Sequence, residues 1–302
     1  MIVVIPVMSI VAACTVFSAR MIEDEVRLPP MRNEVGRLPN WLGSSEAPKI
    51  AKRLGSISGG RVLDVATGRG GFIDTLMNTL KDYESFVGID NCTYYDSAKE
   101  MREGREHFKD RPVEFAKMNG EHTGFGDGSF DTVCISYALH HLDDLDTVLV
   151  EMRRVLRPGG FFIIQELYCD GDRTEAQMVD ELDHEWCAGI DRLLGMTHNK
   201  AFTKQRLMDF ANGLGLKDLE VFDSDRPVDC LLCERNQLCE DPRNQANFHD
   251  LTKRVDETYD RIKDYPDPEA RNRIKEEGEM IKKAIARSGS APAPYLFIIG
   301  RG

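Results

Sequence analysis

The sequence lacks an excess of basic side chains. Its 302 residues include 39 Lys and Arg against 51 Asp and Glu, which gives a formal net charge of −12. Nucleic-acid backbones are bound mainly through clustered Lys and Arg, so this balance argues against a broad phosphate-binding surface. We therefore expect no nucleic-acid partner, although a small local cationic pocket remains compatible with the composition.

Cysteine is also sparse, with 8 residues in the whole chain. Small secreted domains that depend on disulfides are much richer in cysteine, and a chain of this length can bury a core without cross-links. The hydrophobic fraction of 41% excludes disorder as a description of the whole chain. The length is compatible with one large domain or two small ones.

Charge is missing from residues 1–19, and the first charged side chain is Arg20. A secretory signal has basic residues before its apolar stretch, and a spanning helix needs about 20 apolar residues, whereas this run is barely long enough and contains Pro6. The string Val11–Cys14 resembles a bacterial lipoprotein cleavage site, while Met21 opens a polar, ordinary-looking start. The alternatives are a spurious upstream extension, a genuine anchor or signal, and a buried N-terminal element.

Beyond residue 55, short apolar runs rich in β-branched residues alternate with segments of helical periodicity. The strand-like runs are residues 61–66, 85–90, 113–118, 130–136, 160–167, 216–223 and 295–299. Strands that alternate with helices indicate a mostly parallel sheet with helices on both faces. We predict an α/β fold built on a doubly wound, seven-stranded sheet.

Two segments interrupt this alternation, at residues 173–200 and about 240–288. In the first, Thr174 and Gln177 form a capping-box pattern ahead of a helix. Its apolar residues fall on one helical face: Met178, Leu182, Trp186, Ile190 and Leu193. We predict that both segments form a helical lid, with the face that contains Trp186 buried against the sheet and an apolar chamber left beneath it. The alternative for the charged second segment is a dimer arm or a solvated appendage.

The predicted organisation of the chain therefore has seven parts. A homodimer is compatible with this organisation. The parts are an apolar extension at 1–20, an N-terminal segment at 21–54, a Rossmann-like core at 55–172, a helical lid insertion at 173–200, the end of the core at 201–239, a helical insertion at 240–290 and a last core strand at 291–302. Ligands of such folds bind at the carboxyl ends of the strands, which both insertions can reach. An apolar chamber there suits a small organic molecule.

A glycine-rich turn, DVATGRGG at Asp64–Gly71, follows the first strand. Glycine allows close approach of a ligand to the backbone, and the N–H groups of the next helix favour anionic or polar groups. Asp90 ends the second strand about 20 residues later, where an acid can accept hydrogen bonds from ribose hydroxyls. NAD and S-adenosylmethionine (SAM) both contain such a ribose, but the G-x-G-x-x-G spacing typical of dinucleotide binding is absent.

Four motifs in register resemble those of the class I SAM-dependent methyltransferases over roughly residues 55–165. They are VLDVATGRGG, VGID, GEHTGFGDGSFDTVCISYALHHLDD and VLRPGG. The nearest branch is the bacterial small-molecule group that includes quinone-biosynthesis methyltransferases. The resemblance implies S-adenosyl-L-methionine as cofactor, a small organic acceptor and a cytoplasmic location, with membrane contact only if residues 1–19 are genuine.

The resemblance also assigns the cofactor to particular residues. Asp64, Gly68 and Gly70 would surround the methionyl end, and Asp90 would hold the ribose. The remaining positions would flank the adenine or line the pocket beneath the sulfonium: Asn119 and Gly120 for the adenine, and Ser136, Tyr137 and His140 for the sulfonium pocket. Two positions depart from the family pattern, because Ala66 replaces its usual first glycine and Asn119 replaces a common acid.

The catalytic candidates are His140, His141 and Tyr137, which follow the fourth strand. SAM is an activated methyl donor, so a general base is needed only if the acceptor must lose a proton. An imidazole titrates near neutral pH and could accept it; the alternative is that both histidines only cap the strand end. Glu166 and His198 are further candidates.

Cys230, Cys233 and Cys239 form a C-x2-C-x5-C pattern, and His249 could complete a zinc site. A second C-x2-C is absent, so we interpret these residues as semi-buried cysteines and predict no metal site. Two rival functions stay open: a non-catalytic SAM-binding protein, and a thiol-dependent, arsenite-type methyltransferase that would also use Cys169 and Cys187.

Overall fold

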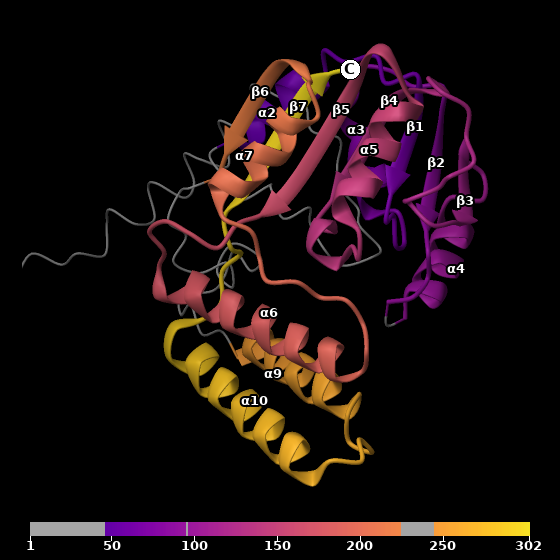
Figure 1. Cartoon of the computed structure of the whole chain (residues 1–302). Helices are drawn as coiled ribbons and strands as arrows, with labels where there is room; N and C mark the ends of the chain where they lie inside the picture. The colour runs from indigo at the N-terminus through magenta and orange to yellow at the C-terminus, as the bar shows by residue number, and fades with distance from the viewer. Residues whose placement is uncertain (1–45, 95, 225–244) are drawn as a thin grey trace, which may run out of the picture.

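The computed structural model describes residues 46–94, 96–224 and 245–302, and its centre is a seven-stranded sheet (Figure 1). The strands are β1 Arg61–Val65, β2 Ser85–Asp90, β3 Val113–Lys117, β4 Phe130–Ser136, β5 Leu156–Leu167, β6 Lys217–Asp223 and β7 Tyr295–Arg301. They lie in the order β3-β2-β1-β4-β5-β7-β6. Neighbours among β1–β5 are parallel, and β7 runs antiparallel to both β5 and β6. The predicted doubly wound α/β fold is confirmed.

Helices cover both faces of the sheet. They are α2 Ala47–Leu54, α3 Gly71–Thr79, α4 Ser97–His107, α5 Leu145–Val155 and α7 Lys204–Gly213, with a short 3-10 helix, η2, at Leu139–His141. Successive strand residues point to opposite faces. Val62 packs with the buried residues of α2 and α3, whereas Leu63 packs with those of α5 and α7. Both faces of the central strands are thus buried, as their nearly continuous apolar sequence predicts.

The start of β5 differs from the sequence prediction. We expected the strand to begin at Gly160, but β5 begins at Leu156, directly after α5. Leu156 pairs with Phe130, and the register shifts before Phe161 pairs with Thr132. Pro158 and Gly159 therefore lie in an irregularity of the strand, which is where proline and glycine are tolerated in a sheet.

A helical bundle, formed by α6 Glu175–Leu193, α9 Gln245–Asp260 and α10 Pro268–Ser288, lies next to the edge at which β1–β5 end (Figure 1). The capping box predicted at Thr174 and Gln177 is present, and Asp267 caps α10 just before Pro268. The bundle has a core of its own, which contains Val179, Trp186, Ile190, Val255, Ile262, Ile274, Ile281 and Ile285.

The predicted packing of α6 against the sheet is wrong. Trp186 is buried between helices, and its indole N–H donates a hydrogen bond to the carbonyl of Ile274 at 2.9 Å. Met178 and Leu182, which we placed on the buried face, are 51% and 48% exposed. The amphipathic pattern showed that α6 buries one face, but α9 and α10 supply the apolar partner instead of the sheet.

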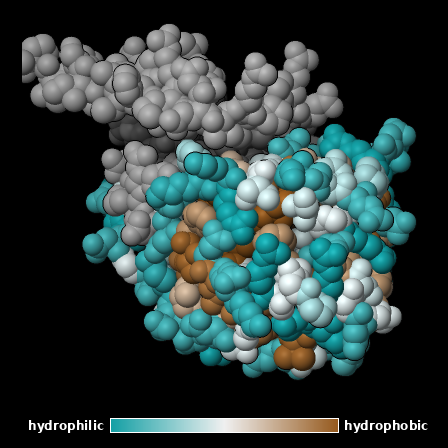
Figure 2. All heavy atoms as spheres, turned by 90° about the horizontal axis from the view of Figure 1, so that it is seen from above, coloured by the Kyte–Doolittle hydropathy of each residue, from teal (hydrophilic) through white to brown (hydrophobic). Residues whose placement is uncertain are grey.

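The opposite end of the molecule, seen from above in Figure 2, is largely hydrophilic with small apolar patches. Among the described residues, no helix is long and apolar enough to cross a membrane. Residues 1–19 lie outside the described residues, as do Cys230, Cys233 and Cys239. The predictions made for those segments therefore remain predictions.

Candidate active site

The glycine-rich turn after β1 adopts left-handed backbone conformations. Ala66, Gly68 and Gly70 have φ values of 56°, 53° and 84°. A side chain at Gly70 would also place its Cβ 2.8 Å from the rings of Phe108 and Phe115, so glycine is required there by space as well as by backbone angle. Ala66 adopts its conformation at a steric cost, which is a pattern seen at functional sites.

Asp64 is buried beneath this turn and is 2% exposed. One carboxylate oxygen accepts a hydrogen bond from the Thr67 hydroxyl at 2.7 Å, and the other accepts from the Cys134 thiol at 3.4 Å. Burial disfavours the charged form and raises the pKa of Asp64 to about 7, against the two hydrogen bonds that lower it. A neighbouring cation would restore the charge.

Asp90 connects the glycine-rich turn to the end of β2. Its Oδ2 accepts a hydrogen bond from the Gly68 N–H at 3.2 Å, and its Oδ1 accepts from the Cys92 N–H at 2.8 Å. Asp64 and Asp90 stand on paired strands, so the first two sequence motifs meet at one edge of the sheet. Asp90 is partly exposed and retains lone pairs for a ligand.

Asn119 and Gly120 follow β3, which pairs with β2, and so continue the same edge. Asn119 is exposed, and its side chain accepts a hydrogen bond from the backbone N–H of Glu121 at 3.0 Å and donates one to the Glu121 carboxylate at 3.3 Å. The structure thus supplies an acid beside the position where the family pattern has one. Glu121 was not singled out from the sequence.

The end of β4 forms a polar network with β5. The Ser136 hydroxyl donates to the Gln165 side-chain carbonyl at 3.1 Å, and the Gln165 amide donates to the Tyr137 hydroxyl at 3.1 Å. Tyr137 has a left-handed φ of 49°, and its backbone N–H is held by the Gln165 carbonyl at 2.8 Å. This strained residue turns the chain into η2, which carries the two histidines.

His140 is almost completely buried and contacts Glu166 at the end of β5. Its Nδ1 lies 3.1 Å from Glu166 Oε1, while the other carboxylate oxygen accepts the Leu139 N–H at 2.8 Å. Oε1 also accepts the Leu167 N–H at 2.9 Å. Backbone donors thus hold both carboxylate oxygens of Glu166, and the contact with Nδ1 orients the imidazole so that its Nε2 faces His184.

His141 lies beside this pair. Its ring centroid is 4.2 Å from that of His140, 4.3 Å from that of His198 and 4.6 Å from that of Tyr94. Its Nδ1 is buried without a hydrogen-bond partner among the described residues. Burial lowers the pKa of His141 to about 2, so the ring is neutral.

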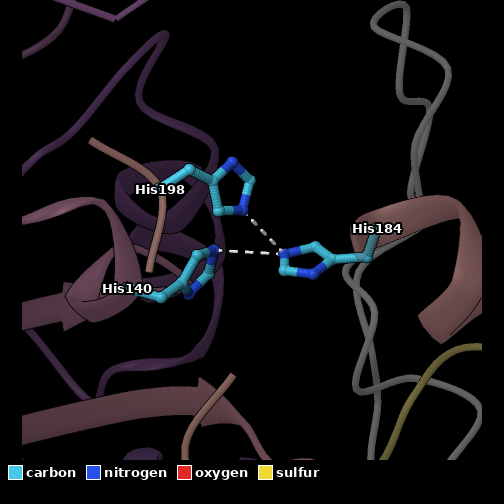
Figure 3. Close-up of side chains that lie close together, drawn as sticks. All are labelled: His140, His184 and His198. Carbon is cyan, nitrogen blue, oxygen red and sulfur yellow. Dashed lines mark hydrogen bonds between the residues drawn. The ribbon is translucent and has the colours of Figure 1, made fainter. Parts of the chain in front are cut away.

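Three imidazoles converge at the junction of the sheet and the bundle (Figure 3). They come from η2, from α6 and from the segment after α6: His140, His184 and His198. His184 Nε2 lies 3.3 Å from His140 Nε2 and 3.3 Å from His198 Nε2. His198 Nδ1 lies 2.6 Å from the buried Asp191 carboxylate, which also accepts from the Tyr94 hydroxyl at 2.5 Å.

Of the predicted site residues, the structure thus brings His140, Glu166 and His198 together and places Asp64 beside Asp90. His249 is exposed on α9. Sequence reasoning missed His184 and Asp191. Their separation of seven residues, two helical turns, puts both on one face of α6 and was the signal that could have found them.

Residues 63–164 match the sequence model of a family described as "Methyltransferase domain". A demethylmenaquinone methyltransferase of Lactococcus lactis is 34% identical over 115 residues, covering 37% of this chain and 44% of that protein. A ubiquinone/menaquinone biosynthesis C-methyltransferase UbiE of Hahella chejuensis is 34% identical over 140 residues, covering 43% of this chain and 53% of that protein. The chain thus spans about half the length of these relatives.

Among solved structures, the [4+2]-cyclase SpnF is similar with a TM-score of 0.50 and 16% identity, over 84% of this chain and 78% of that one. The MccD protein has a TM-score of 0.50 and 15% identity, over 84% and 94% of the two chains. At these identities the likeness concerns the fold alone. The bundle residues lie outside the segment that matches the family model.

Proposed function

We propose that this chain, whose residues 63–164 match the methyltransferase-domain family model, transfers a methyl group from SAM to a small organic acceptor. The observation that carries the proposal is the meeting of the glycine-rich turn with Asp90 at the carboxyl edge of the sheet, where the Gly68 N–H binds the Asp90 carboxylate. Folds of this kind bind their ligands at that edge.

The cofactor is S-adenosyl-L-methionine. We place its methionyl end at Asp64, Gly68 and Gly70, because glycine leaves no side chain over the turn there and the buried Asp64 lacks a cationic partner among the described residues. The partly exposed Asp90 is available to the ribose hydroxyls. Asn119, Gly120 and the neighbouring Glu121 stand next along the edge, where the adenine would lie.

Catalysis by such a site consists mainly of positioning, since the sulfonium already activates the methyl group. Ser136 and Tyr137 are held by Gln165 and would form the wall next to the reacting carbon. If the acceptor must lose a proton, His140 is the base best prepared for it, because Glu166 binds its Nδ1 and orients the ring. We propose that the neutral ring of His141 forms part of the wall of the acceptor site and does not act as a base.

The acceptor is proposed to be small and largely apolar. The net charge of −12 disfavours polyanionic partners, and the two relatives reported above are named for demethylmenaquinone and for ubiquinone/menaquinone biosynthesis. The bundle stands over the edge of the sheet at which the acceptor would enter (Figure 1). We propose that it acts as a lid that limits the size of the acceptor.

Isothermal titration with SAM and with its demethylated product tests the proposal. We expect one site per chain, with affinity reduced at least tenfold by Asp90→Ala and unchanged by Asp146→Ala, an exposed aspartate at the start of α5. Absence of binding to either ligand would contradict the proposal. Binding without methyl transfer across a panel of small organic acceptors would instead favour a non-catalytic SAM-binding protein.

A further inference from the structure

The three converging imidazoles have the spacing of ligands around one metal ion (Figure 3). Zinc–nitrogen bonds of 2.0–2.1 Å at a tetrahedral angle place two ligand nitrogens about 3.3–3.4 Å apart. The Nε2 atom of His184 lies 3.3 Å from the Nε2 atoms of both His140 and His198. One ring nitrogen of each histidine lies within 4.8 Å of one ring nitrogen of the other two, so the remaining His140–His198 pair is the one that a side-chain adjustment must bring closer.

When the neutral His140 and His198 rings carry their protons on Nδ1, toward the carboxylates, hydrogen bonding alone does not satisfy all three Nε2 atoms. His140 and His198 each face a carboxylate through Nδ1, so in their neutral forms each directs an Nε2 lone pair at His184. His184 Nε2 carries at most one proton and can donate it to only one of them. The other contact then brings two lone pairs together at 3.3 Å. A cation at the centre satisfies all three nitrogens.

The surroundings of the cluster also match those of metal sites. Ligating histidines usually donate their second N–H to a carboxylate, which fixes the tautomer and makes the ligand more basic. Glu166 is the carboxylate that faces Nδ1 of His140, and Asp191 is the one that faces Nδ1 of His198. Both carboxylate side chains are 0% exposed. Each is held in turn: Glu166 by the N–H groups of Leu139 and Leu167, and Asp191 by Tyr94 and by an ion pair with Arg261.

We propose that His140, His184 and His198 bind a divalent transition-metal ion, with zinc as the best match, through their Nε2 atoms. Imidazole ligands suit Zn, Cu, Fe and Ni, whereas Mg and Ca prefer oxygen ligands. The site is formed only in the folded chain, because its ligands are 44 and 14 residues apart in sequence and come from η2, α6 and the segment after α6.

Three protein ligands leave the fourth position of a tetrahedral ion open for water or for an oxygen of the acceptor, as in catalytic zinc sites. This use of the ion rests on the proposed function, whereas binding of the ion does not. An ion on Nε2 also excludes His140 as a base. The ion would then promote proton loss itself, because it lowers the pKa of a bound hydroxyl group.

The proposal is tested on the full chain, purified, stripped with a chelator and titrated with Zn²⁺ or Co²⁺. We expect about one ion per chain by elemental analysis, since zinc in protein sites binds tightly. Tetrahedral Co²⁺ should give visible d–d bands without the near-ultraviolet band of thiolate ligands. His184→Ala and His198→Ala should each reduce the bound metal at least tenfold.

Two controls address the alternative site that the sequence offers. His249→Ala and the double variant Cys230→Ser/Cys233→Ser should retain the ion. Loss of metal in these controls but not in His184→Ala would overturn the proposal, as would fewer than about 0.2 ions per wild-type chain after titration with Zn²⁺.

Far-ultraviolet circular dichroism identifies a variant that fails to fold, and His184→Asn then replaces it. SAM titration of the stripped chain is read separately, so failure of the metal site and failure of the proposed function are distinguishable.

Discussion

At the scale of single residues, two aspartates with similar positions on neighbouring strands differ in how deeply they are buried. Asp90 is partly exposed and accepts two backbone N–H groups. Asp64 is buried with only a hydroxyl and a thiol as donors, and burial raises its pKa to about 7. Asp64 therefore costs folding free energy when charged, which is expected of a group whose partner is a ligand.

The first prediction concerns Asp64→Asn. A pKa raised above the unfolded value means that the folded chain binds the proton more tightly, so stability falls as pH rises from about 4 to 7. We expect the variant to be more stable than wild type by up to about 4 kcal/mol at pH 8 and nearly equal to it near pH 4, since the pKa rises from 3.8 to about 7 and one pKa unit corresponds to about 1.4 kcal/mol. Urea denaturation at both pH values measures the difference.

The same variant should bind SAM at least tenfold more weakly at pH 8, because the cationic methionyl end loses its partner. Asp209→Asn, on α7, is the matched control for both measurements. Equal stability of Asp64→Asn and wild type at pH 8 would contradict the pKa argument. Unchanged SAM affinity would contradict only the placement of the cofactor.

At the scale of elements, local signals in the sequence predicted where elements begin and end, but not what they pack against. The Thr174–Gln177 capping box lies as predicted, because it depends on residues that are neighbours along the chain. The partner of the Trp186 face was wrongly predicted, since an amphipathic pattern does not distinguish a sheet from another helix.

The candidate site shows the same division. The glycine-rich turn and Asp90 could be predicted because each motif is continuous in sequence and the parallel sheet brings strand ends together. His140, Glu166 and His198 were recognised one at a time, as strand-end or loop residues. Their meeting with His184 depends on how α6 crosses the edge of the sheet, which no local pattern encodes.

The second prediction tests this crossing through Tyr94, which follows β2 and donates its hydroxyl to Asp191 on α6. Tyr94→Phe removes one hydrogen bond to a buried carboxylate, which is worth about 1–3 kcal/mol. We expect faster amide hydrogen exchange in residues 183–193 and no change in β1–β5. Tyr83→Phe, whose ring packs against Phe86, is the control. Identical exchange in α6 of Tyr94→Phe and wild type would show that this contact does not hold the helix.

At the scale of the whole molecule, the described chain has two kinds of core. One lies on both faces of the sheet and includes the domain that matches the methyltransferase family; the other lies inside the bundle. Polar contacts between Asp191, His184 and residues at the strand ends connect them. A change inside the bundle core can therefore loosen the bundle while the sheet stays folded, which allows its proposed function as a lid to be tested separately.

The last prediction uses Trp186→Ala for this purpose. Removing a buried tryptophan costs about 3–5 kcal/mol, and here the loss falls on contacts with Val255, Ile274 and Gly278 inside the bundle. A lid slows both entry and exit of the cofactor, so loosening it should raise both rate constants about tenfold while the Kd for SAM changes less than about threefold, because gating alone leaves the equilibrium unchanged. Stopped-flow binding of SAM measures both rates.

Leu54→Ala, which removes a buried side chain of α2 beside the sheet, controls for general destabilisation and should leave the rates unchanged. Unchanged rates in Trp186→Ala would instead show that the bundle is a solvated appendage or a dimer arm, because neither of these obstructs the strand ends.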